Sequence, residues 1–251
     1  MILVWLESIK LLVNPISAFF VENMIAVFFF YGLAFFVMGL ALAFASRQTS
    51  QLHFVKAIRP LAAFGILHGC HEWIDMFQLI AAQTNGYTPT VWEATARLGV
   101  LVLSFIMLLS FGVLLPDREP EGRGRRLGLL VALVALWGAS VALVALWQQP
   151  DGRDLVAMAD VLARYFLGIP GTLLGAIALL RLQRSFREHD MSQFGRDLVW
   201  CAAALFFYGI VGQLFVAKTA LLLSQWLNSD LFLAWFGIPI QLFRATMAVM
   251  L

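Results

Sequence analysis

The chain has 251 residues, of which 61% are hydrophobic and 13% are charged, and its formal net charge is +2. This composition and a mean hydropathy of +0.85 exclude a water-soluble globular protein and give no indication of nucleic-acid binding. Because one membrane-spanning helix needs about 20 apolar residues, we expect a single all-α domain over residues 1–251. It would be a polytopic transmembrane bundle of seven helices in contact with the lipid bilayer.

Residues 1–18 mix apolar side chains with Glu7 and Lys10, and Pro15 interrupts them before the run is long enough to cross a bilayer. Such a segment is typical of an amphipathic helix that lies in the membrane interface. It lacks the basic leader and the small-residue cleavage site of a signal peptide. We therefore expect an N-terminal interfacial helix that remains in the mature protein.

Seven apolar stretches predict membrane spans, with periodicity and length as the criteria. The spans lie at about 22–46, 58–82, 92–115, 127–147, 155–180, 197–217 and 231–251. Most of the 17 basic residues fall in the connections 47–59, 116–126 and 181–196. The positive-inside rule assigns these connections to the cytoplasm. We therefore expect an outside N-terminus, a cytoplasmic C-terminus and a location in the bacterial inner membrane.

The outer connection 218–230 contains an amphipathic run at 220–227. This run predicts a short lid on the outer surface, with Ser229 or Asp230 as the N-cap of the last span. Two cysteines, Cys70 and Cys201, lie in apolar stretches, and we interpret them as packing residues without a disulfide.

The tripeptide Gly-Ile-Pro occurs at 168–170 and again at 237–239, which places a proline inside two of the predicted spans. A proline within a helix kinks it and frees a backbone carbonyl. We expect kinks at Pro170 and Pro239, and either a binding cavity or packing alone would account for them.

The second span carries four ionisable side chains, His68, His71, Glu72 and Asp75. Their spacing of i, i+3, i+4 and i+7 puts all four on one face of a helix. An ionisable group at bilayer depth costs about 2.5 kcal/mol or more, so such groups normally face a bundle interior or a water-filled cavity. This face therefore predicts a polar pocket inside the bundle.

Further polar side chains occur early in spans that run inward from the outer surface, at i, i+3 or i+4 spacing on each helix. These residues are Glu93 and Arg97, Asp160 and Arg164, and Gln241 and Arg244. All of them would gather in the outer half of the bundle. Two interpretations stay open: a structural network in which arginines neutralise carboxylates, or a pocket whose arginines bind an anionic or carbonyl-bearing ligand.

Imidazole groups are ligands for haem iron, zinc and copper, and His68 and His71 are the histidines that fall within predicted spans. A b-type haem with one histidine ligand, or a transition metal held by His68, His71 and a carboxylate, is one interpretation. Histidines that only form hydrogen bonds are the other. The residue order matches neither H-E-x-x-H nor H-x-x-E-H.

Three stretches, 30–40, 61–73 and 237–245, resemble the N-terminal multi-span input region of bacterial sensor histidine kinases and diguanylate cyclases. The most specific part is His68-Gly69-Cys70-His71-Glu72-Trp73. The resemblance implies a membrane sensor that is not itself catalytic. Its last helix would continue beyond Leu251 into a cytoplasmic kinase or cyclase domain, and the full-length protein would be a homodimer.

The leading hypothesis is therefore a sensory input domain that detects a small-molecule or lipid-like ligand, or a redox cofactor, in the outer-half pocket. Occupancy would bias two packings of the bundle and move the last helix. The alternative is a haem- or metal-binding membrane enzyme or electron carrier that uses His68 and His71. A small transporter is a third hypothesis, although the inner half offers few polar groups to continue a path.

Overall fold

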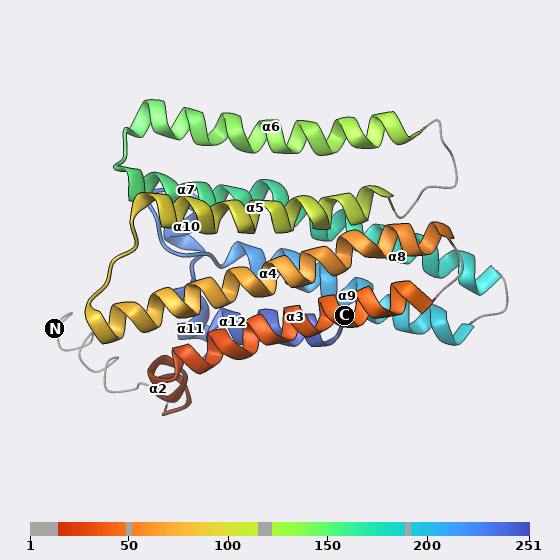
Figure 1. Cartoon of the computed structure of the whole chain (residues 1–251), viewed down its shortest axis with the longest axis horizontal. Coiled ribbons are helices and arrows are strands. Elements are labelled where there is room, and N and C mark those ends of the chain that lie inside the picture. The colour runs from red at the N-terminus through yellow and green to blue at the C-terminus, as the bar shows by residue number, and fades with distance from the viewer. Residues whose placement is uncertain (1–14, 49–51, 115–121, 189–191) are drawn as a thin grey trace.

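The computed structural model describes residues 15–48, 52–114, 122–188 and 192–251. Within these ranges every regular element is helical, and one isolated bridge joins Val216 to Asn228. The long helices run along a common axis and form an elongated bundle (Figure 1). The expected all-α fold is confirmed.

The helices have the following bounds in chain order. They are α2 (Pro15–Glu22), α3 (Met24–Gln48), α4 (Leu52–Asn85), α5 (Val91–Leu114), α6 (Arg123–Gln148), α7 (Gly152–Ala163), the π-helical turn η2 (Arg164–Gly168), α8 (Ile169–Glu188), α9 (Ser192–Leu214), α10 (Leu222–Trp226), α11 (Ser229–Phe236) and α12 (Ile240–Val249).

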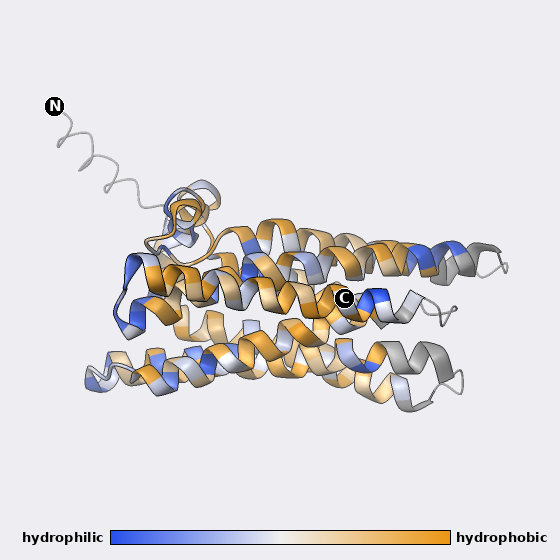
Figure 2. Cartoon of the chain, turned by 90° about the horizontal axis from the view of Figure 1, so that it is seen from above, coloured by the Kyte–Doolittle hydropathy of each residue, from blue (hydrophilic) through white to orange (hydrophobic). Residues whose placement is uncertain are grey.

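Five helical segments of the described chain are long and apolar enough to cross a membrane. They are Met24–Ser46, Val91–Val113, Gly124–Gln148, Gly152–Arg184 and Arg196–Leu214. These segments coincide with the first, third, fourth, fifth and sixth predicted spans. A sixth is reached if α11 and α12 together count as one broken span. Figure 2 shows the corresponding pattern, with apolar residues along the middle of the bundle and polar residues toward its ends.

The second predicted span lies within α4, which has 34 residues and is long enough to cross a bilayer. It is not one of the five candidates because its histidine and carboxylate face lowers its hydropathy. In the structure α4 packs along α3 on one side and α5 on the other. Its polar face is therefore buried by protein.

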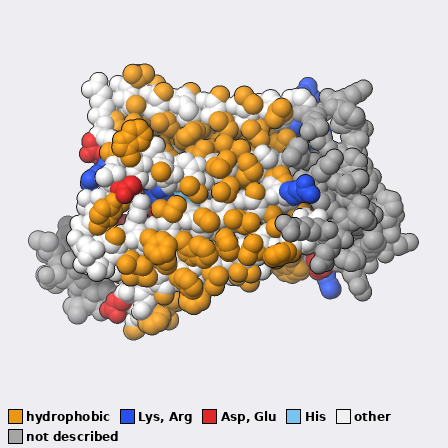
Figure 3. Space-filling view, viewed as in Figure 1, with side chains coloured by type: hydrophobic (Ala, Val, Ile, Leu, Met, Phe, Trp, Pro, Cys, Tyr) orange, Lys and Arg blue, Asp and Glu red, His pale blue; other side chains and the backbone are white. Residues whose placement is uncertain are grey.

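α6 is the most peripheral helix and packs only against α5, α7 and η2 among the strongly contacting elements (Figure 1). Its apolar side chains stay largely exposed, and Leu146 keeps 74% of its surface. The space-filling view in Figure 3 shows that apolar side chains also cover the broad face of the bundle. Such a surface suits contact with lipid.

Connections alternate between the two ends of the bundle (Figure 1). The turns from α4 to α5 and from α6 to α7, together with α10, lie at one end. At the other end lie the C-terminal ends of α3, α5 and α8 and the N-terminal ends of α4, α6 and α9, and we call it the arginine end because these helix ends carry most of the basic residues.

The two Gly-Ile-Pro segments behave differently. At 168–170 the helix continues through Pro170, and the Ile169 N–H donates to the carbonyl of Arg164, which forms the π-helical turn η2. At 237–239 the helix breaks, and the axes of α11 and α12 differ by 82°. Gly237 takes a left-handed backbone conformation with φ of 70°, which a glycine adopts without strain. The single span expected over 231–251 is thus replaced by two short helices.

Of two smaller expectations, the N-terminal helix is described only in part and the N-cap of the last span is corrected. The helix expected over 1–18 is described only from Pro15, as α2, which Figure 1 views nearly end-on, and residues 1–14 lie outside the described part of the chain. The expected lid contains the short helix α10. The N-cap of α11 is Asn228 instead of Ser229 or Asp230, because the Asn228 Oδ1 accepts a hydrogen bond from the Leu231 N–H. Both cysteines are free, as expected.

Candidate functional site

Polar side chains from six helical elements converge in the part of the bundle away from the arginine end. They come from α4 (His68, His71, Glu72, Asp75), α5 (Arg97), α7 and η2 (Asp160, Arg164), α9 (Gln213) and α12 (Gln241, Arg244). Every site residue expected from the sequence belongs to this group except Glu93. The structure therefore brings together residues that are far apart in the sequence.

Four of these residues form an alternating series of charges, which we call the ion-pair chain. Asp75 accepts hydrogen bonds at 2.9 and 3.2 Å from Nη1 of Arg97. Nη2 of Arg97 lies 3.2 Å from Asp160, and Nε of Arg164 donates to Asp160 at 2.8 Å. Each carboxylate thus contacts a guanidinium group, which offsets the desolvation of buried charge.

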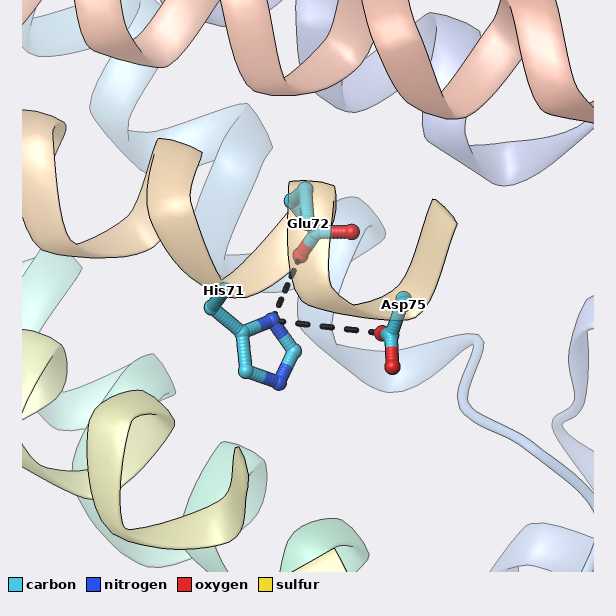
Figure 4. Close-up of side chains that lie close together, drawn as sticks. All are labelled: His71, Glu72 and Asp75. Carbon is cyan, nitrogen blue, oxygen red and sulfur yellow. Dashed lines mark hydrogen bonds and ion pairs between the residues drawn. The ribbon is translucent and has the colours of Figure 1, made fainter. Parts of the chain in front are cut away.

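His71 links the ion-pair chain to Glu72. Figure 4 shows the Nδ1 atom of the His71 ring facing the carboxylates of Glu72 and Asp75. Nδ1 lies 3.1 Å from Glu72 Oε1, and Nε2 lies 3.4 Å from Nη1 of Arg97. Because a guanidinium group only donates, Nε2 is assigned as the acceptor and Nδ1 carries the proton.

His68 is the centre of a second group of contacts that we call the His68 junction, composed of Tyr31, His68, Ser104 and Tyr208, and its Nε2 also lies 3.5 Å from Glu72 Oε1. Ser104 donates its hydroxyl proton to the Leu101 carbonyl, so it accepts from His68 Nδ1 at 3.2 Å. Nε2 then accepts from the hydroxyl groups of Tyr31 at 3.2 Å and Tyr208 at 2.8 Å. The junction joins α3, α4, α5 and α9 through one neutral, fully buried imidazole.

The backbones of α3 and α4 lie close together, which brings Tyr31 of α3 within hydrogen-bond distance of His68 on α4. A Cβ atom on Gly69 would lie 2.6 Å from the carbonyl oxygen of Gly32 and 2.9 Å from Phe36 Cβ. Gly65, four residues earlier, faces Phe35 and Gly39 equally closely. Small residues at this spacing let two membrane helices approach through their backbones. At Gly69 the backbone of α4 thus lies directly against the backbone of α3.

Arg244 is anchored on the C-terminal end of α9. Its Nε donates to the Gly212 carbonyl at 2.6 Å, and its Nη2 donates to the Phe215 carbonyl at 3.1 Å. The side chain is buried, and no carboxylate within the described residues forms an ion pair with it. On the neighbouring side, Nη1 of Arg164 donates to Gln213 at 3.3 Å. The interpretation in which arginines only neutralise carboxylates does not account for Arg244.

These side chains enclose a cavity of about 200 Å³, which we call the polar pocket. Its wall includes Glu72, Arg164, Gln241 and Arg244 together with the ion-pair chain. Phe215–Ala217 and Ser229 also line it, so the segment that leads into α10 covers part of the pocket. The pocket thus combines groups of both charges within a mainly apolar bundle.

Glu93 lies outside the polar pocket, on the first turn of α5. Its carboxylate accepts hydrogen bonds from the Thr90 N–H at 2.8 Å, the Thr90 hydroxyl at 2.7 Å and the Tyr87 hydroxyl. This arrangement is a capping box, which gives hydrogen-bond partners to backbone N–H groups at the start of α5. The hydrogen bond to Glu93 raises the pKa of Tyr87, which lies in the connection before α5. The role of Glu93 here is structural.

The donor set fits neither haem nor a metal ion in this arrangement. Donor atoms of His71, Glu72 and Asp75 lie within 4.8 Å of one another, which is close enough to hold a cation. However, Nη1 of Arg97 already donates hydrogen bonds to the Asp75 carboxylate and to Nε2 of His71, so these atoms are not available to a cation. Both ring nitrogens of His68 have hydroxyl partners, and a cavity of about 200 Å³ is smaller than the 300–1,000 Å³ typical of cofactor sites.

Sequence reasoning missed Tyr31, Ser104, Tyr208 and Gln213. Tyrosine and serine are ordinary in apolar helices, and their hydroxyls have no spacing that points to His68. Gln213 occurs near the end of a predicted span, and its burial together with its contact to Arg164 appears only in three dimensions. Comparisons of the chain with protein-family models, with curated proteins and with solved structures find no match.

Proposed function

We propose that this chain is the sensory input domain of a bacterial inner-membrane signalling protein, a histidine kinase or a diguanylate cyclase. In this proposal α4 and the α11–α12 pair complete seven spans, the N-terminus lies outside and the arginine end lies in the cytoplasm. The polar pocket then opens in the outer half of the bundle. A small ligand in the pocket is the signal.

The observation that carries the proposal is the place of Arg244. It is the one arginine on α12, the last helix, and it lines the pocket while its side chain is hydrogen-bonded to α9. A ligand that contacts Arg244 therefore contacts the element nearest to the C-terminal end. Direct contact of this kind supplies the differential interaction that coupling between a site and a moving element requires.

The packing around α12 supports the same mechanism. α12 packs against α3 and α9, which the His68 junction ties to α4 and α5. Beyond the C-terminal end of α12, the Cys201 thiol of α9 lies 3.6 Å from the Leu251 carbonyl oxygen. We infer a rigid frame of α3, α4, α5 and α9 along which α12 shifts when the pocket is occupied. In a homodimer, this shift would be passed to the output domains.

The native gene provides the test. We expect its reading frame to continue past the codon for Leu251 into a kinase or cyclase domain. We expect Arg244→Gln to change the output of that protein, measured as autophosphorylation or cyclic dinucleotide synthesis, by at least about fivefold. Arg153→Gln, at an exposed arginine on α7, is the matched control. A stop codon directly after Leu251, or wild-type output from Arg244→Gln, would contradict the proposal.

A further inference from the structure

Within the described residues, two charged side chains of the polar pocket, Glu72 and Arg244, form no ion pair with an arginine or a carboxylate. The ion-pair chain contains two carboxylates and two guanidinium groups and balances itself. Among the described residues, Glu72 contacts only the imidazole rings of His68 and His71, and the guanidinium group of Arg244 donates only to backbone carbonyls. One negative and one positive charge therefore remain in the wall of the same cavity, and buried charges are unstable without partners.

Three of the side chains that line the cavity have an atom without a hydrogen-bond partner among the described residues. Within the described residues, Nη1 of Arg244 and Nη2 of Arg164 make no hydrogen bond, and neither atom is fully buried. Oε2 of Glu72 likewise accepts no hydrogen bond. All three side chains line the pocket. The wall thus offers two guanidinium edges as donors and one carboxylate oxygen as an acceptor.

The size of the pocket limits the occupant. Its volume of about 200 Å³ lies below the 300–1,000 Å³ typical of sites for drug-sized molecules. The amide of Gln241 also lines the cavity and makes no hydrogen bond within the described residues. A small polar molecule fits this space, whereas a haem or a phospholipid does not.

We propose that the polar pocket binds a small zwitterion with one carboxylate and one ammonium group, such as an amino acid, and this proposal rests on the sensory function above. The ligand carboxylate accepts hydrogen bonds from Arg164 and Arg244, a charge-assisted pairing that guanidinium groups favour. The ligand ammonium donates to Glu72 Oε2. A carboxylate alone would leave Glu72 unpaired, and an amine alone would leave Arg244 unpaired.

Calorimetric titration of the protein in lipid nanodiscs tests the proposal. The probes are glycine, β-alanine and γ-aminobutyrate, compared with propionate and propylamine, which carry only one of the two charges. We expect at least one zwitterion to bind about tenfold or more tightly than either single-charge probe. The chain length of the preferred zwitterion reports the separation of Glu72 from the two arginines.

Variants of Glu72 and Arg244 test which residue binds the ammonium group of the ligand and which binds its carboxylate. Glu72→Gln should remove the preference for the zwitterion over propionate, and Arg244→Gln should weaken zwitterion binding about tenfold or more. Arg244→Lys keeps the charge and serves as the second variant if Arg244→Gln does not fold. Glu93→Gln and Arg153→Gln are matched controls that change the same charges outside the pocket.

The results separate this proposal from the sensory function. If no zwitterion binds more tightly than the single-charge probes, or if Glu72→Gln keeps the same preference, the zwitterion proposal is overturned. A signalling output that still depends on Arg244 would leave the sensory function standing in that case. Tight zwitterion binding without any effect on output would support the ligand class and contradict the sensory function.

Discussion

The His68 junction and the polar pocket lie one helical turn apart on α4, and they differ in how their polar atoms are satisfied. At the junction both ring nitrogens of His68 have hydroxyl partners, and the ring has no exposed surface. At the pocket, Glu72 and Arg244 line a cavity and each keep an atom without a hydrogen-bond partner among the described residues. The comparison shows that some buried polar groups of this bundle are saturated by contacts between helices, whereas others keep the unpaired atoms on which we base the proposed ligand site.

The ion-pair chain borders both regions, and breaking it should have the largest effect. Arg97→Met would leave Asp75 and Asp160 without their shared guanidinium group, and we expect a loss of about 3–5 kcal/mol in the free energy of unfolding. Arg153→Met removes an exposed arginine and is the control. Unfolding by titration with a denaturing detergent measures the stability of both variants. Equal stability of Arg97→Met and Arg153→Met would contradict the stabilising role of the ion-pair chain.

A change in helix spacing should affect the junction next most strongly. Gly69→Ala places a methyl group 2.6 Å from the Gly32 carbonyl, which forces α3 and α4 apart. We expect a loss of about 1–3 kcal/mol, as for other overpacked interiors. Gly138→Ala on α6 is the control, because nothing lies within 4 Å of its Cβ position. The same unfolding titration applies, and a neutral Gly69→Ala would show that the helices are not in close contact.

Removing one hydroxyl from the junction should separate stability from ligand binding. Tyr208→Phe deletes the 2.8 Å hydrogen bond to His68, and we expect a loss of about 1 kcal/mol in unfolding free energy. Affinity for the preferred zwitterion should stay at the wild-type value, because Tyr208 does not line the pocket. If Tyr208→Phe lost affinity for the zwitterion while its unfolding free energy stayed unchanged, the junction would serve ligand binding and not helix packing, which would contradict this account.

The smallest effect concerns Glu93, which lies apart from both regions. Its hydrogen bond raises the pKa of Tyr87 above the ordinary value of 10.0. Since the folded pKa is raised, this hydrogen bond stabilises the fold fully below pH 10 and is lost as the pH rises through the higher folded pKa. Titration of tyrosinate absorbance should show the Tyr87 transition move to lower pH in Glu93→Gln. An unmoved transition would contradict the contact.

Much of the fold followed from the sequence because membrane spans depend on length and hydropathy. Five predicted spans correspond to helices that meet those criteria, and the spacing of His68, His71, Glu72 and Asp75 identified a buried face. Gly237 and Pro239 indicated in the sequence that the helix breaks before α12. No local pattern indicated the angle between α11 and α12. Prolines at 170 and 239 have the same sequence context and different outcomes, since neighbouring packing decides whether a helix continues.

The site was predictable where it depends on spacing along one helix. Glu93 with Arg97 has the same i, i+4 spacing as Asp160 with Arg164, and only the second pair forms an ion pair among the described residues. Thr90, three residues before Glu93, was the readable signal of a capping box.

Partners from distant helices were not predictable. Tyr208 lies 140 residues from His68, and Arg244 hydrogen-bonds to backbone carbonyls, which every residue carries. No pattern of residue types identifies either contact before the helices are packed together.

The central claim is that Arg244 couples the polar pocket to the position of α12. The Cys201 thiol lies beside the Leu251 and Met250 carbonyls, so its alkylation rate reports whether α12 stays against α9. Mass spectrometry of the Cys201 peptide after exposure to N-ethylmaleimide measures that rate. We predict at least about a fivefold faster reaction in Arg244→Gln and wild-type rates in Tyr208→Phe and Arg153→Gln. A wild-type rate in Arg244→Gln, or an equal rise in all three variants, would contradict the account.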